Sequence, residues 1–398
     1  MSEIAPAEVI AGKRTAKVTS RFGDWGMILA IGAVLQAIGL AAQNLSPVLV
    51  APLSQGRGLS EGMAGVVQTV ELAVVAFAAY HLTWLAAKMS ARRLALIGTT
   101  IAAVCHILST FATPLPLLLV LRAVAGLGEA MCVCAANAVM SAQAEPDKIY
   151  GRSYAIISLA GIGLYPLLVY VGAQTNGWGV YAGEGVWFLL LLPIVALLPP
   201  LSQPVSADAA PKVVIKLPLL NLLPTVPIAL VTIFSIGLWA FAGTVAQTAK
   251  VSSDVFGWTL AIGTALSAVS AWVSSLLGTR FGRLRPLIIG LAVTVIGSVA
   301  FFTAKDAMVY AISFVLVQIV YSFILPYMFG FCSALDKTGR LATTASSVML
   351  IASAAAPALI GWVIQVAGMP ALVVALVIGY GLAGMTIYIS TVLLKEDA

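Results

Sequence analysis

The chain has 398 residues, of which 61% are apolar and only 9% are charged, whereas an ordinary soluble domain is about half apolar and a quarter charged. A water-soluble core of this length cannot hide so much apolar surface, so the composition excludes a soluble enzyme, a nucleic-acid-binding domain and a disordered chain. A polytopic membrane protein remains, and the formal net charge of +6 has to be explained within that class.

Twelve mainly apolar runs follow one another along the chain, and each is long enough to cross a bilayer, which takes about 20 helical residues. Strands of a membrane barrel would instead alternate over about ten residues. The predicted fold is therefore an all-α membrane protein with twelve transmembrane helices. The first six runs are 26–50, 62–86, 94–112, 115–141, 153–174 and 185–201. The second six are 224–249, 256–278, 286–303, 307–334, 341–366 and 371–394.

The longest connection, 202–223, is polar and contains three prolines, which is typical of a linker. It divides the chain into two six-helix halves, 26–201 and 224–394. The remaining residues form two predicted tails, 1–25 and 395–398.

Lysine and arginine are distributed unevenly over the connections. With the N-terminus in the cytoplasm, seventeen of the 21 lie in cytoplasmic segments and only Arg57, Lys250 and Lys305 in outer loops. Positively charged loops stay on the cytoplasmic side, so the sequence predicts that both termini are cytoplasmic and that the protein lies in a plasma membrane, the inner membrane of a bacterium. The asymmetry also explains the net charge without a nucleic-acid partner.

Charged side chains inside a membrane span are costly and mark functional sites. The predicted spans contain three, which are Glu71 on the second helix and Arg122 and Glu129 on the fourth. A carboxyl group in a low dielectric can bind and release a proton near neutral pH, whereas an arginine cannot. We therefore predict that Glu129 carries a proton and that Arg122 is its partner or binds a substrate anion. A structural clamp between the fourth and first helices is the alternative.

Glu71 is open to three interpretations, as a second proton site, as the partner of Arg122, or as a hydrogen-bonded residue facing the eleventh helix. His81 and His106 are expected to be packed, hydrogen-bonded residues, because a lone histidine is more often structural than a switch.

Neutral polar and aromatic side chains on three helices predict a pocket for an organic solute, although hydrogen bonds between helices would explain the same residues. They are Gln36, Gln43 and Asn44 on the first helix, Ser235 and Trp239 on the seventh, and Gln318, Tyr321, Ser322 and Tyr327 on the tenth. The four cysteines lack metal-ligand spacing, so no metal site and no cofactor is predicted. An enzyme is not expected either, since the sequence offers no nucleotide loop, catalytic triad or cluster of His, Asp and Glu.

The two halves contain matching features. Arg92 and Arg283 follow the second and eighth helices, Pro166 and Pro357 lie in the fifth and eleventh, and the members of each pair are 191 positions apart. Such matches between corresponding positions indicate an internal repeat.

Two motifs resemble those of the major facilitator superfamily of secondary transporters. Gly278–Arg285 is similar to the family's helix 8–9 loop, G-x-x-x-D-R-x-G-R-R, with Thr279 in place of the usual aspartate, and Lys88–Arg93 is a more degenerate first-half copy. Arg122–Ala130 fits the family's R-x-x-x-G-x-G pattern on the fourth helix. Its Gly-Glu-Ala ending is similar to that of spinster-type lipid transporters, and a related glutamate occurs in organic-anion symporters.

The resemblance implies alternating access, in which the two halves rock about a midplane cavity lined by helices 1, 4, 7 and 10. Helices 2, 5, 8 and 11 would form the gates, with Arg92, Arg93, Arg283, Arg285, Pro166 and Pro357 as gating residues. It also implies a monomer in the lipid bilayer. We therefore expect a proton-coupled symporter of a small organic solute, an organic acid or an amphipathic molecule. The alternative is a proton-coupled efflux pump for lipophilic drugs or lysolipid-type substrates.

Overall fold

The computed structural model describes residues 23–82, 88–141, 146–201, 219–335 and 340–393. In this part of the chain every regular element is helical. The elements that precede the linker are α1 (Gly23–Ile31), the π-helix η1 (Gly32–Gly39), α2 (Ala41–Asn44), α3 (Ser46–Gln55), α4 (Glu61–His81), α6 (Ala91–Phe111), α7 (Leu115–Ser141), α8 (Pro146–Gln174) and α9 (Gly179–Val195). Those that follow are the 3₁₀-helix η2 (Leu219–Thr225), α10 (Val226–Ala240), α11 (Ala242–Thr248), α12 (Ser253–Leu277), α13 (Leu284–Phe302), α14 (Ala307–Leu335) and α15 (Arg340–Leu393).

The helices confirm the predicted all-α membrane architecture. Eight of the described helices are long and apolar enough to cross a membrane, and three shorter apolar helices lie at 25–39, 161–174 and 179–195. The longest helix, α15, joins the last two predicted spans across Gly368, whose positive φ of 78° breaks the helical path. The helices thus correspond to the twelve predicted spans.

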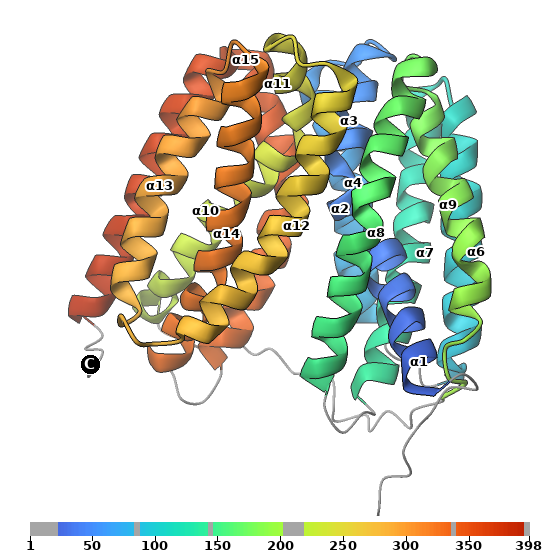
Figure 1. Cartoon of the computed structure of the whole chain (residues 1–398), viewed down its shortest axis with the longest axis horizontal. Helices are drawn as coiled ribbons and strands as arrows, with labels where there is room; N and C mark the ends of the chain where they lie inside the picture. The colour runs from blue at the N-terminus through green and yellow to red at the C-terminus, as the bar shows by residue number, and fades with distance from the viewer. Residues whose placement is uncertain (1–22, 83–87, 142–145, 202–218, 336–339, 394–398) are drawn as a thin grey trace, which may run out of the picture.

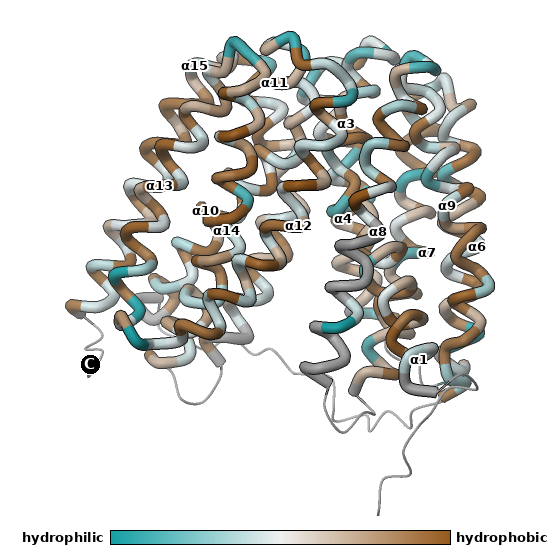
Figure 2. Tube along the Cα trace, in the orientation of Figure 1, coloured by the Kyte–Doolittle hydropathy of each residue, from teal (hydrophilic) through white to brown (hydrophobic). Residues whose placement is uncertain are grey.

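The helices stand side by side in two groups, α1 to α9 on the right of Figure 1 and α10 to α15 on the left. Figure 2 shows hydrophobic residues along the length of α6 and α13 and hydrophilic residues gathered at the connections. Large apolar side chains are exposed on the outer helices, among them Phe111, Ile296, Met308 and Val366. Such a surface suits contact with lipid tails. The boundaries of the linker stay a prediction, because residues 202–218 lie outside the described residues.

The first span, predicted as one helix over 26–50, is broken into four pieces. The π-helical turn of η1 ends at Leu40, and a second interruption at Leu45 separates α2 from α3. Pro47 lies at the start of α3 and has no N–H, so it cannot bond the carbonyl of Gln43, four residues earlier. The carbonyl of Ala42 accepts hydrogen bonds from the side chains of Ser46 and Gln68, each at 2.6 Å. Backbone groups are therefore free for side chains at the middle of this span.

The sixth span begins and ends six residues earlier than predicted, at Gly179–Val195 rather than 185–201. The preceding turn is made by Asn176 and Gly177, both with positive φ, a conformation that glycine and asparagine tolerate best. The shift corrects the prediction for one acidic residue, since Glu184 lies inside α9 and not in the loop before it.

Candidate functional site

A cavity of about 170 Å³ lies between the two groups of helices. Six side chains predicted to bind substrate line it, and Ser235 and Ser322 line it as well. These six are Gln36, Gln43, Asn44, Trp239, Gln318 and Tyr321. Further lining residues come from helices that the sequence did not assign to the pocket, including Tyr165 of α8, Trp187 of α9 and Thr264 of α12. The fourth span, α7, which the resemblance placed in the lining, contributes no residue to it among those described.

The broken first span supplies the polar edge of this cavity. Trp239 donates its indole N–H to the carbonyl of Gln43 at 3.0 Å, and the Tyr165 hydroxyl donates to the carbonyl of Asn44 at 2.9 Å. The Asn44 amide in turn donates to the carbonyl of Gln36 at 2.9 Å. The rings of Tyr165 and Trp239 meet edge to face with centroids 6.1 Å apart. The interruptions of the first span thus leave the carbonyls of Gln43 and Asn44 free to accept hydrogen bonds. An aromatic side chain from each half, Trp239 and Tyr165, donates to them.

Two hydrogen-bond donors that line the cavity are buried without a protein partner, the Gln36 Nε2 and the Trp187 Nε1. An unpaired buried donor is costly, so both are suited to bind a ligand. No Asp, Glu, Lys, Arg or His occurs among the described lining residues. The cavity is therefore neutral and rich in amides, hydroxyls and aromatic rings.

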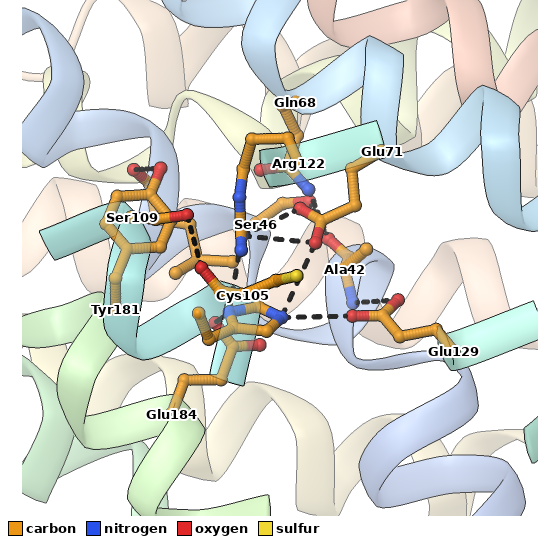
Figure 3. Close-up of polar contacts among 12 residues, drawn as sticks. Ala42, Ser46, Gln68, Glu71, Cys105, Ser109, Arg122, Glu129, Tyr181 and Glu184 are labelled. Atoms are coloured by element: carbon orange, nitrogen blue, oxygen red, sulfur yellow. Dashed lines mark hydrogen bonds and ion pairs between the residues drawn. The ribbon is translucent and has the colours of Figure 1, made fainter. Parts of the chain in front are cut away.

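A cluster of five ionisable side chains is buried beside this cavity, within the first group of helices. Glu71 of α4, His106 of α6, Arg122 and Glu129 of α7, and Glu184 of α9 each have 0% exposure. Arg122 extends toward Glu71 (Figure 3), and its Nη1 lies 3.1 Å from both carboxylate oxygens. The ion pair was one of the three interpretations of Glu71 that the sequence left open. Arg122 is not among the residues that line the cavity.

His106 lies at the centre of the cluster, whereas the sequence predicted only a packed residue. Its Nδ1 is 2.7 Å from Glu184 Oε2 and 3.2 Å from Arg122 Nη1. Its Nε2 is 3.3 Å from Glu129 Oε1 and 3.5 Å from Glu71 Oε1. The imidazole therefore contacts every other charged member of the cluster. His81 lies elsewhere, exposed at the end of α4 and stacked on Phe77.

Glu129 joins the cluster to the broken span. Its Oε2 accepts a hydrogen bond from the backbone N–H of Ala42 at 3.4 Å, and Figure 3 shows the two residues facing each other. Ala42 lies in α2, directly before Gln43 and Asn44, which line the cavity. The short helix α2 therefore contacts the charged cluster on one side and the cavity on the other.

Three members of the cluster could by geometry hold a metal ion, because ligand atoms of Glu71, His106 and Glu129 lie within 4.8 Å of one another. The guanidinium of Arg122 already lies against Glu71 and His106. A further cation there would be repelled by it. The arrangement therefore does not favour a metal ion.

Arg57 and Tyr181 cover the cluster on the side of the α8–α9 turn. The Arg57 guanidinium donates to the carbonyls of Ser109, Thr110 and Ala112 at the end of α6. It also lies 5.5 Å from the Tyr181 ring, whose centroid is 4.7 Å from Arg122. Partial burial lowers the pKa of Arg57, which remains a cation because an arginine is not deprotonated in proteins.

Sequence reasoning missed Glu184 because it placed the start of the sixth span too late, and it did not connect His106 with Glu71, Arg122 and Glu129. The signal was present: Asn176-Gly177 is a strong turn, and a span that begins directly after it includes Glu184. The expectation that the chain holds no cluster of His and Glu was therefore wrong.

The predicted gating residues fall into two sets. Arg92 donates to the carbonyl of Leu198 at 2.6 Å, a contact within the first half. Arg93 and Arg285 are exposed, and Arg283 lies beside Gly330 of α14. The two prolines instead lie where the halves meet: a Cβ at Gly257 would lie 2.8 Å from Pro166 Cα, and one at Gly65 would lie 2.1 Å from the Pro357 carbonyl.

Polar contacts between the halves gather at the side away from the C-terminus. The Gly62 N–H donates to Gln365 at 3.2 Å, and Thr244 donates to Glu61 at 3.4 Å. In Figure 1 the neighbouring helices α3 and α11 meet at the top, opposite the labelled C-terminus. On this side the two halves are in direct contact, and a second cavity of about 550 Å³ lies there between α3, α8 and α9 of the first half and α11 and α12 of the second.

Comparisons with known proteins agree with this fold. A family model described as the Major Facilitator Superfamily matches residues 29–344. A bacterial homologue of the human lysosomal transporter Spinster, solved in an inward-facing and occupied conformation, is 18% identical, with a TM-score of 0.65, 92% of this chain and 96% of that chain covered. The nucleoside transporter NupG is 12% identical with a TM-score of 0.66, covering 93% and 99%. A D-xylose-proton symporter is 17% identical with a TM-score of 0.63, covering 94% and 97%. Among curated proteins none matches the sequence.

Proposed function

We propose that the chain, which belongs to the Major Facilitator Superfamily, is a secondary transporter that moves a small, uncharged organic solute and couples this movement to protons through Glu129. The observation that carries the proposal is the position of α2. Its Ala42 N–H bonds the carboxylate of Glu129, while the carbonyls of Gln43 and Asn44 hold the aromatic wall of the cavity.

The coupling follows from what Glu129 can do in each protonation state. An ionised carboxylate is a strong acceptor for the Ala42 N–H, because hydrogen bonds to charged groups are about twice as strong as neutral ones. Protonation weakens this bond and removes a buried negative charge. Protonation of Glu129 therefore changes the strength of its hydrogen bond to α2. The position of the Gln43 and Asn44 carbonyls at the edge of the cavity changes with it.

The cavity favours an uncharged solute over the organic acid expected from the sequence. That expectation depended on Arg122 as an anion ligand, but Arg122 is paired with Glu71 and lies outside the lining. Free donors at Gln36 and Trp187, together with the rings of Tyr165 and Trp239, suit hydroxyl or carbonyl groups on a small ring. Sugars and nucleosides combine these features, and two of the structural neighbours are a D-xylose-proton symporter and a nucleoside transporter.

The efflux alternative, with lysolipid-type substrates, receives less support from the geometry. A volume of about 170 Å³ lies below the range of about 300–1,000 Å³ that is usual for drug-sized ligands. It suits a compact molecule. The cytoplasmic position of both termini and the inner-membrane location rest on the distribution of Lys and Arg and belong to the proposal, as does a monomer.

The test is flux in liposomes that contain a trapped pH dye. D-xylose, uridine, a monocarboxylate and a lipophilic cation are added outside in turn. Proton movement inward with D-xylose or uridine supports symport of an uncharged solute. Inward proton movement with the monocarboxylate alone would restore an organic acid as the expected substrate. Outward proton movement in exchange for the lipophilic cation would favour efflux. If none of the four solutes changes the internal pH, proton coupling is contradicted. Size exclusion has to show that the protein is folded.

A further inference from the structure

His106 and Glu184 form a fully buried acid–base pair that the role proposed for Glu129 does not use. The His106 Nδ1 lies 2.7 Å from Glu184 Oε2, and both side chains have 0% exposure. Neither oxygen of Glu184 has a partner that meets hydrogen-bond geometry. The close ring nitrogen is therefore the group that compensates this carboxyl.

The charges of the cluster require protons. Arg122 and Glu71 compensate each other as an ion pair. Glu129, Glu184 and His106 remain, and two bare carboxylates beside a neutral imidazole would leave two uncompensated negative charges away from water. Burial of unpaired charge is strongly unfavourable. Both carboxyl groups thus need a positive or protonated partner.

The surroundings of the ring show where one proton lies. Arg122 Nη1 is always a donor and is 3.2 Å from Nδ1. When the single lone pair of Nδ1 accepts from Arg122, Glu184 has to carry its own proton as a neutral carboxylic acid. When Nδ1 is protonated, it places its proton beside the Glu184 carboxylate, 2.7 Å away. In both cases one proton belongs to the pair of Glu184 and His106.

The other ring nitrogen faces the remaining carboxylates, since Nε2 is 3.3 Å from Glu129 Oε1 and 3.5 Å from Glu71 Oε1. The titratable and charged groups around the ring come from three helices: Glu71 from α4, Arg122 and Glu129 from α7, and Tyr181 and Glu184 from α9, with Cys105 preceding His106 on α6. A proton on Nε2 therefore points toward the carboxylate oxygens of Glu129 and Glu71.

We propose that Glu184 and His106 hold a second exchangeable proton of the coupling cluster, and that the imidazole passes protons between Glu184 and Glu129. In the transfer the Glu184 O–H bond breaks and Nδ1–H forms, while Nε2–H breaks and a Glu129 O–H forms. Glu184 becomes ionised, Glu129 becomes neutral, and the ring changes tautomer without a change of charge. The proposal rests on the proposed proton coupling and extends it from one proton to two.

The test is nitrogen NMR of the purified full-length protein with ¹⁵N-labelled histidine. The chain has only two histidines, so the exposed His81 serves as an internal reference for the buried His106. The two ring nitrogens of a neutral imidazole resonate far apart, whereas those of an imidazolium resonate close together. Spectra are recorded between about pH 5 and 8 for the wild type, Glu184→Gln and Glu129→Gln. The exposed Asp254→Asn is the matched control.

In the wild type we expect the His106 resonances to change with pH and to show a proton shared at Nδ1. Glu184→Gln should abolish this change and leave one neutral tautomer, whereas Glu129→Gln should leave the Nδ1 proton and alter Nε2. A wild-type His106 that keeps one neutral tautomer at every pH overturns the proposal, even if Glu184→Gln does not fold. His106 signals in Glu184→Gln that equal those of the wild type overturn it as well.

The spectra need no transported solute, so their outcome is independent of the flux experiment. Proton-driven flux together with an invariant His106 would contradict the second proton and leave the proposed function standing. A shared proton at Nδ1 in a protein without flux for any solute would contradict the proposed function and support the proton pair.

Discussion

The backbone N–H of Ala42 lies 3.4 Å from the carboxylate of Glu129, an interaction between residues 87 positions apart in the sequence. It connects the short helix α2 of the first span to an acidic residue on the fourth. Gln68 holds the carbonyl of the same residue at 2.6 Å. Ser46 bonds the same carbonyl at 2.6 Å, so three side chains bond the backbone of Ala42, and among them only Glu129 can change its charge.

Replacing Glu129 by Gln should abolish uphill transport and preserve exchange. The amide oxygen of glutamine can still accept from Ala42, so the hold on α2 remains while the exchangeable proton is lost. We expect concentrative uptake in liposomes to fall to the level of empty vesicles, with counterflow of the same solute near the wild-type rate. Asp254→Asn removes an exposed carboxyl on α12 and should change neither. Concentrative uptake by Glu129→Gln at the wild-type level would remove Glu129 from coupling.

Truncation of Arg122 should destabilise the protein because it leaves Glu71 buried without its partner. Breaking a buried ion pair in this way typically costs about 3–5 kcal/mol. We expect Arg122→Ala to lower the thermal unfolding temperature in detergent strongly. Glu71→Gln together with Arg122→Gln should recover much of the loss.

The exposed Arg280→Lys is the control for loss of a guanidinium and should unfold like the wild type. If the double variant is as unstable as Arg122→Ala, the charge of Glu71 is not the cause, and the Arg122 contact with the Tyr181 ring at 4.7 Å becomes the explanation.

Replacing Trp239 by Phe should weaken solute binding without unfolding the cavity wall. Phenylalanine keeps an aromatic ring against Phe314, whose ring centroid is 5.6 Å from that of Trp239. It loses the hydrogen bond to the Gln43 carbonyl, and a typical bond of about 1 kcal/mol corresponds to about fivefold in affinity. The KM of the solute identified in the flux assay measures this change. Trp258→Phe, at a 52% exposed position, should leave KM unaltered, and an equal change in both variants would argue against a role of the cavity.

The substitution Gly65→Ala should push the two halves apart at the end of the molecule where α3 and α11 meet. Its Cβ would lie 2.1 Å from the carbonyl of Pro357, and overpacking of this kind costs about 1–3 kcal/mol. Spin labels at Gln174→Cys and Gln247→Cys, both exposed, should report a longer distance in Gly65→Ala. The four native cysteines are buried and leave the labelling specific. Gly381→Ala, with no atom within 4 Å of the added Cβ, should leave the distance as it is.

Most of the fold follows from apolar run length, because a helix that crosses a bilayer must be long and continuous in apolar residues. Helix ends are less certain, since they depend on turns and caps rather than on hydropathy. The run 185–201 looked like a complete span because its last residues are apolar. The structure instead places the turn at Asn176 and Gly177 and ends the helix at Val195.

The site was predictable in part. Spacing along single helices selected the neutral residues that line the cavity, because residues seven apart share a face. The cluster was not predictable as a whole, since α4, α6, α7 and α9 each contribute one or two members and no spacing within one helix connects them. Pairing with Glu71 also removed Arg122 from the cavity, which only the packing of α4 against α7 could show.

The π-helical turn η1 (Gly32–Gly39) also fixes the rotational register of everything that follows it in the first span. A π-turn accommodates an additional residue compared with an α-turn. Deleting one residue within η1 would remove that additional residue and allow ordinary α-helix there, so Gln43 and Asn44 would keep facing Trp239 and Tyr165. The same deletion within the ordinary helix α1 (Gly23–Ile31) has no wide turn to absorb it and would rotate the preceding residues by about 100° relative to the cavity. The cavity should thus tolerate the loss of one residue in η1 better than the loss of one residue in α1, although neither deletion replaces a side chain that lines it.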